Sequence, residues 1–177
     1  MTARLAPLLA AAIASGAFVQ PHPDFSGTWT FVPQSPPSGQ AFQRLSTGDP
    51  VTITQDATTI TIDYVSGSRA HMPVKMVYNL DGSERTNIDR NTLPASQART
   101  SRAAWRGAEL VLTTITPRLD ATGAPDPVET TEALSLESPS TLRVKMTRHS
   151  KALTDSATAV YQRSKNSTGN FVRTIIG

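Results

Sequence analysis

Apolar and polar residues alternate with a period of two along much of this chain. The alternation is clearest in three segments, in which the apolar residues fall on one face: Ile60, Ile62 and Tyr64; Val74, Met76, Tyr78 and Leu80; and Leu142, Val144 and Met146. Successive side chains of a β-strand point to opposite faces, so a period of two predicts strands with one buried face. The sequence lacks long helix-forming stretches, which also favours an all-β protein.

Turn signals separate these strands. Asp81-Gly82 directly follows one strand and is the strongest hairpin signal, with residues 84–88 as the expected returning strand. Proline-broken loops are expected at residues 89–97 and 117–127. About nine or ten strands follow one another in sequence order, and closure of such a meander removes its two exposed edges. The sequence therefore predicts an antiparallel up-and-down meander of about nine or ten strands that closes into a barrel, with a β-sandwich as the alternative.

The N-terminal residues predict a secretory signal peptide. Arg4 precedes an apolar run over residues 5–19, which holds small residues at positions 15–17. The run is short for a permanent membrane helix, which needs about 20 apolar residues, and it matches the regions of a signal. We expect cleavage after Ala17, with an uncleaved anchor as the alternative. Residues 1–17 are then the signal peptide, 18–165 one barrel domain and 166–177 a C-terminal tail. The mature protein is expected to be secreted or periplasmic in a bacterium, without a stable membrane anchor.

Charge and cysteine content exclude several classes of protein. The chain has no cysteine, so an exported core must hold by packing without a disulfide framework. Its formal net charge is +3, and aromatic residues interleaved with basic ones for base stacking are missing. No nucleic-acid partner is expected. Basic residues form two groups, for which a solvated barrel wall is weighed against a patch for an anionic polymer or lipid head group. They are Arg143, Lys145, Arg148 and Lys151, and Arg99, Arg102 and Arg106.

No catalytic or metal-binding constellation stands out. His22, His71 and His149 lack the spacing that places two imidazoles on one metal, and His22 lies in a leader expected to be disordered. No Gly-x-Ser-x-Gly elbow occurs. We interpret the acidic cluster as a solvated edge; its members are Asp120, Asp126, Glu129, Glu132 and Glu137. The expectation is a protein that is not an enzyme and that holds no metal and no cofactor.

The segment Asp24-Phe25-Ser26-Gly27-Thr28-Trp29 resembles the opening of lipocalin-like (calycin) β-barrels, whose first strand begins with Gly-x-Trp. Gly27 and Trp29 match the two defining positions, and Phe25 matches the flanking aromatic residue. The resemblance implies that Trp29 closes one end of the barrel beneath an arginine from the last strand, and Arg163 fits that arginine by position. Residues 78–84 and 105–110 are also similar to segments of uncharacterised exported bacterial proteins with this opening.

The functional hypothesis is an exported lipocalin-like protein that binds a small hydrophobic molecule inside its barrel. Few large aromatic residues are available to fill a ten-stranded interior, which favours a cavity. The inward faces supply the expected ligand-binding residues, which are Ile62, Tyr64, Met76, Tyr78, Val144 and Met146. The two tyrosine hydroxyls are the expected polar contacts. The alternative is a solid-cored envelope or partner-binding structural protein without a ligand.

Overall fold

The computed structural model describes residues 22–33, 49–65, 73–88 and 98–164. The expected signal peptide at 1–17 lies outside the described residues, as do the expected tail at 166–177 and loop at 89–97. Within the described ranges, no helix is long and apolar enough to cross a membrane.

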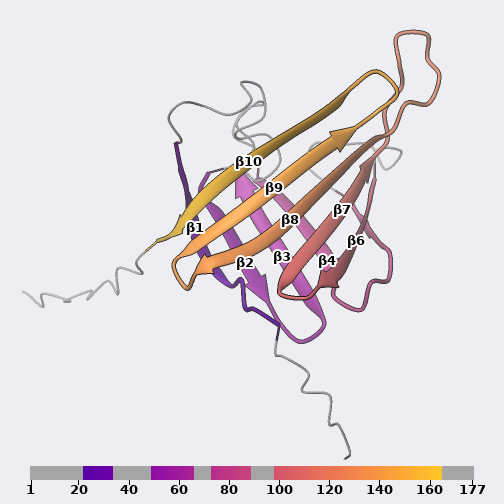
Figure 1. Ribbon diagram of the computed structural model, residues 1–177. Helices are drawn as coiled ribbons and strands as arrows, with labels where there is room; N and C mark the ends of the chain where they lie inside the picture. The colour runs from indigo at the N-terminus through magenta and orange to yellow at the C-terminus, as the bar shows by residue number, and fades with distance from the viewer. Residues whose placement is uncertain (1–21, 34–48, 66–72, 89–97, 165–177) are drawn as a thin grey trace, which may run out of the picture.

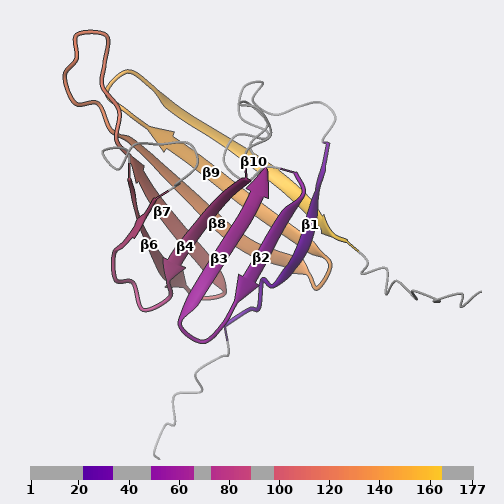
Figure 2. The same ribbon diagram turned by 180° about the vertical axis from the view of Figure 1, so that it is seen from behind.

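The described residues contain ten β-strands in one antiparallel sheet. The strands are β1 (Gly27–Val32), β2 (Val51–Gln55), β3 (Thr59–Val65), β4 (Pro73–Asn79), β5 (Arg85–Asn87), β6 (Arg99–Arg106), β7 (Glu109–Thr116), β8 (Val128–Ser138), β9 (Thr141–His149) and β10 (Thr154–Arg163). Their order in the sheet is β4-β3-β2-β1-β10-β9-β8-β7-β6-β5. Pairing of the first strand with the last curls the meander into a nearly closed barrel (Figures 1 and 2). The predicted fold class is confirmed, and the sandwich alternative is not what forms.

The alternating faces of the strands build the interior of the barrel. In β9, for example, Leu142, Val144 and Met146 are buried while Lys145 between them is exposed. The largest side chains with almost no exposed surface are Trp29, Tyr78, Tyr161, Phe25, Ile60, Leu110, Leu112, Leu134, Leu142 and Met146. A period of two therefore places one contiguous apolar core inside the sheet, as expected for strands with one buried face.

The two edges of the sheet, β4 and β5, meet at a seam. No β-ladder joins them, although they are consecutive in sequence. Instead the Asn87 side chain pairs with the backbone of Val77: the Val77 N–H donates to Asn87 Oδ1 at 2.8 Å, and Asn87 Nδ2 donates to the Val77 carbonyl at 2.9 Å. Ser101 Oγ, which accepts from Asn87 Nδ2 at 2.6 Å, donates to the same carbonyl at 3.0 Å. Side-chain groups thus occupy the place of a backbone ladder.

The prediction that the strands before and after Asp81-Gly82 pair as a hairpin is therefore wrong. The chain does turn there, with Gly82 at a φ of +83°, and β5 lies within the expected returning segment. However, β5 forms its ladder with β6, from Arg85 opposite Ser101 to Asn87 opposite Arg99. The Asn87 amide stands between β5 and Val77, so the two strands are held apart by the length of a side chain.

Residues before β1 pack against the end of β6. His22 stacks on Trp105 with ring centroids 4.0 Å apart, and Phe25 lies 6.1 Å from the same ring. The expectation that His22 belongs to a disordered leader is wrong, because an aromatic contact orders it. Trp105 lies near the end of β6 and Arg99 begins that strand, so their surroundings lie toward opposite ends of the barrel.

Candidate functional site

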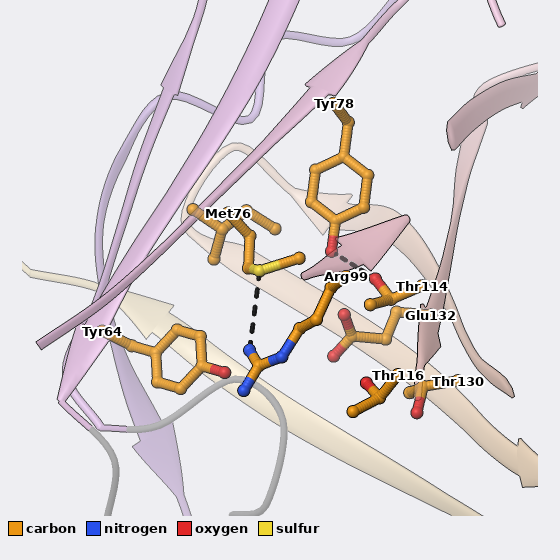
Figure 3. Close-up of a pocket in the computed structure, with 9 residues that line it drawn as sticks. Tyr64, Met76, Tyr78, Arg99, Thr114, Thr116, Thr130 and Glu132 are labelled. Atoms are coloured by element: carbon orange, nitrogen blue, oxygen red, sulfur yellow. Dashed lines mark hydrogen bonds between the residues drawn. The ribbon is translucent and has the colours of Figure 1, made fainter. Parts of the chain in front are cut away.

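A cavity of about 160 Å³ lies among β3, β4, β6, β7 and β8. Nine residues line it: Ile62, Tyr64, Met76, Tyr78, Arg99, Thr114, Thr116, Thr130 and Glu132 (Figure 3). The wall from β3 and β4 is apolar and aromatic. The facing wall from β6, β7 and β8 carries three threonine hydroxyls, a guanidinium and a carboxylate. The cavity thus combines apolar surface with a few convergent polar groups, which is the usual composition of a small-molecule site.

The structure brings four of the six expected ligand-binding residues to this cavity, namely Ile62, Tyr64, Met76 and Tyr78. Val144 lies instead in the packed part of the interior, beside a void of only about 10 Å³. Met146 is buried opposite Glu132 in the β8–β9 ladder, outside the lining. The barrel is therefore packed on its β9 side and hollow between β4 and β8. The role of all six residues in binding a ligand stays a prediction.

Arg99 projects into the cavity from the first position of β6, as Figure 3 shows. Its Nη1 donates to the Met76 sulfur at 3.6 Å. A thioether is a weak acceptor, whereas a guanidinium carries five donors and stays ionised. Arg99 Nε is buried and has no hydrogen-bond partner among the described residues. A buried donor without an acceptor is costly, so this nitrogen marks a place that favours an oxygen of a bound molecule.

Glu132 presents a carboxylate to the same cavity from the middle of β8, and the residue is only 5% exposed. The interpretation of the acidic cluster as a solvated edge is wrong for this residue. It is also wrong for Asp126, which is 1% exposed and accepts the Lys151 backbone N–H at 2.9 Å. The face on which Glu132 lies was readable from the sequence, because it has the same strand parity as the buried Leu134.

Tyr78 is a neutral polar group within the cavity. Its hydroxyl lies 2.9 Å from Thr114 Oγ1 in a hydrogen bond. Burial raises the pKa of Tyr78 far above its ordinary value, and the negative charge of Glu132 adds to the rise. The hydroxyl therefore keeps its proton at any ordinary pH and acts as a hydrogen-bonding group, with no role as a base.

Gly27, Trp29 and Arg163 meet at another part of the barrel. Trp29 and Arg163 are opposite each other in the β1–β10 ladder, and the guanidinium carbon lies 4.4 Å from the centre of the indole ring. Trp29 Nε1 donates to the Phe25 carbonyl at 2.9 Å, and Arg163 Nη1 donates to the Ser26 carbonyl. A Cβ at Gly27, whose φ is +142°, would lie 2.8 Å from Arg163 Nη1. Glycine therefore lets the guanidinium lie against the backbone.

A second hollow lies near the end of β6, around His22 and Trp105, and includes Asp56 and Asp81. Both carboxylates are already engaged in turns. Asp56 accepts the backbone N–H groups of Thr58 and Thr59, and Asp81 accepts that of Ser83. Among the described residues no group of three histidine, aspartate or glutamate side chains is arranged to hold a metal ion. The cavity around Arg99 and Glu132 is therefore the stronger candidate site.

The fold defines the class of protein as a nearly closed, ten-stranded antiparallel β-barrel, compatible with a calycin-like fold. Comparison with known proteins found no match to a protein-family model, a curated protein or a solved structure.

Proposed function

We propose that this chain is an exported, lipocalin-like protein that binds a small, mainly apolar molecule inside its barrel. The observation that carries the proposal is the cavity of about 160 Å³ between β4 and β8, beside a β9 side of the interior that leaves a void of only about 10 Å³. The Gly27, Trp29 and Arg163 arrangement supports the lipocalin-like part of the proposal, because it has the geometry that the resemblance implies.

The size of the cavity restricts the ligand. An apolar cavity of about 150 Å³ in another protein holds benzene. The volume here is similar, and the apolar wall offers Ile62 and Met76 as contacts. Molecules of about six to nine non-hydrogen atoms therefore fit, whereas a retinoid or a long-chain fatty acid exceeds the space among the described residues. Phenol and cyclohexanol are suitable neutral probes.

The test uses mature protein recovered from the periplasmic or secreted fraction, whose N-terminal sequence is expected to begin near Phe18. Isothermal titration with phenol and cyclohexanol should give saturable binding at one site. Ligands this small reach dissociation constants on the order of 0.1–1 mM. Met76→Trp should abolish binding, because the indole fills the cavity. Lys75→Trp is the matched control, since it places the same ring on the exposed face of β4.

Two outcomes would contradict the proposal. Equal binding by the two tryptophan variants would place the probe outside the barrel. No binding by either probe, in protein whose circular dichroism shows a folded barrel, would favour the solid-cored structural protein. Full-length protein retained in the cytoplasm would overturn the export part alone.

A further inference from the structure

Two side chains of opposite charge face the same small cavity. Arg99 comes from β6 and Glu132 from β8, with β7 between the two strands. Both reach into the space below the apolar wall of Met76 and Tyr78, and the guanidinium extends toward Tyr64 (Figure 3). None of the ion pairs formed within the described residues joins the two. The cavity is therefore lined by one basic and one acidic side chain.

We propose that the ligand is a small zwitterion of the α-amino acid class with a branched aliphatic side chain. Its carboxylate binds Arg99, its ammonium group binds Glu132, and its side chain contacts Ile62 and Met76. The inference rests on the proposed function, because it names the chemistry of a molecule bound in the same cavity.

The carboxylate follows from the hydrogen-bonding state of Arg99. Among the described residues its Nε is buried without an acceptor, and its Nη1 donates to the Met76 sulfur, a weak acceptor. Carboxylate oxygens match the planar donor fork of a guanidinium and form its strongest hydrogen bonds. A purely apolar ligand would exclude water from this group and supply nothing in return.

The ammonium group of the proposed ligand is inferred from the position of the Glu132 carboxylate at the cavity. An ionised carboxylate has about four acceptor positions, so it accepts from a ligand in addition to the contacts that it already makes. A ligand with a carboxylate alone would place an anion beside the Glu132 carboxylate, and like charges close together repel. A zwitterion offers a group of opposite charge to each of the two side chains and adds no net charge to the site.

The apolar part of the ligand follows from the size and the facing wall of the cavity. A benzene-sized volume holds a branched chain of four or five carbons. The hydroxyls of Thr116 and Thr130 lie on the polar wall with Glu132 and offer further hydrogen bonds to the charged end of the ligand. L-leucine therefore has suitable size and polarity.

The experiment compares three compounds that carry the same branched four-carbon side chain, by isothermal titration of the mature protein. L-leucine carries both charges, 4-methylpentanoate lacks the ammonium group, and 3-methylbutylamine lacks the carboxylate. We expect L-leucine to bind at least tenfold more tightly than either analogue. This comparison needs no variant, so it tests the proposal even where a substitution impairs folding.

Two variants, each of which replaces a charged side chain by a neutral one, then test which residue binds which end of the ligand. Arg99→Gln and Glu132→Gln should each weaken L-leucine binding at least tenfold, and Glu132→Gln should strengthen 4-methylpentanoate binding, because it removes the opposing anion. Arg102→Gln and Glu129→Gln are matched controls on the exposed faces of the same strands and should change nothing.

The outcomes separate this inference from the proposed function. Phenol or cyclohexanol binding without L-leucine binding would overturn the zwitterion and leave the cavity as an apolar site. Equal binding of 4-methylpentanoate and L-leucine would overturn the ammonium contact. No binding by any of these compounds would overturn both proposals together.

Discussion

Trp29 connects the first and the last strand of the barrel through one buried side chain. Its indole is fully buried, donates to the Phe25 carbonyl and lies beneath the guanidinium of Arg163, near the end of the last strand. A cation over an indole face is attracted by the ring, more strongly where water is excluded. Trp29 thus holds two segments together, the residues before β1 and the strand β10. It does so by packing, by a hydrogen bond and by the attraction between the Arg163 guanidinium and the indole ring.

Replacing Trp29 should show how much of the stability of the barrel depends on the indole ring. Trp29→Ala is expected to lower the free energy of unfolding by about 3–5 kcal/mol, as for other aromatic truncations in protein cores. Trp29→Phe keeps most of the packing but leaves the Phe25 carbonyl without its donor, so a smaller loss of about 1–3 kcal/mol is expected. Urea unfolding followed by circular dichroism measures both. A loss below about 1 kcal/mol for Trp29→Ala would show that the ring is not a major element of the core.

Single residues also show why sequence reasoning found only half of the candidate site. Tyr64 and Met76 were predicted from alternation, since they are apolar or aromatic members of an inward face. Arg99 and Glu132 lie on inward faces too, yet a charged residue at such a position contradicts the usual pattern, because burying a charge is costly. Their strand parity matches that of the buried Ser101 and Leu134, but their chemistry argued for solvent, and we interpreted both as solvated. The two charges that define the cavity were therefore the least visible from the sequence.

At the level of strands and turns, the β2–β3 turn is held by one carboxylate. Asp56 Oδ1 accepts the backbone N–H groups of Thr58 and Thr59, both at 2.7 Å. Asp56 Oδ2 accepts the Thr59 hydroxyl at 3.0 Å. These hydrogen bonds favour the ionised form and lower the pKa of Asp56 from 3.8 to about 2. The Thr58 carbonyl accepts the Leu80 N–H at 2.8 Å, which ties this turn to the one after β4.

The stability of the turn should therefore depend on pH in acid. A depressed folded-state pKa contributes stability above the unfolded value of 3.8, and that contribution is lost as the pH falls toward 2. Asp56→Asn keeps a side-chain acceptor for the turn but has no proton to gain. The wild type should melt at a higher temperature than Asp56→Asn at pH 5, and the difference should shrink as the pH falls to 2. A difference independent of pH in thermal melts would contradict the role of the charge.

Strand boundaries and the closing of the meander into a barrel were readable from the sequence, whereas the way in which β4 and β5 meet was not. Alternation and turn residues located β3, β4 and β9 closely, because each has one buried face. The Asp81-Gly82 signal was read as a hairpin, since local turn chemistry reports only that the chain reverses. Whether two strands then pair depends on groups far along the chain. Here the side chains of Asn87 and Ser101 form hydrogen bonds with the backbone N–H and carbonyl groups of Val77.

Over the whole molecule, the strand ladders differ greatly in length. The β9–β10 ladder joins nine residue pairs and the β5–β6 ladder only three. The seam between β4 and β5 has no ladder and depends on the Asn87 side chain. Proteins open locally where few bonds must break, so the seam is the expected place of first opening. It also adjoins the cavity, because Met76 and Tyr78 lie on either side of Val77 in β4.

Hydrogen exchange measured by NMR tests whether the seam opens independently of the rest of the barrel. In the wild type, the amide of Val77 is protected by its bond to Asn87 Oδ1. Asn87→Ala removes that acceptor, so the Val77 amide should exchange at least tenfold faster relative to that of Val144, which lies in the middle of β9 between two ladders. Tenfold corresponds to about 1.4 kcal/mol, within the cost of losing one such bond. Thr86→Ala changes an exposed neighbour in β5 and serves as the control. If Val77 and Val144 accelerate by the same factor in Asn87→Ala, the barrel opens as one unit and the seam is not a separate point of entry.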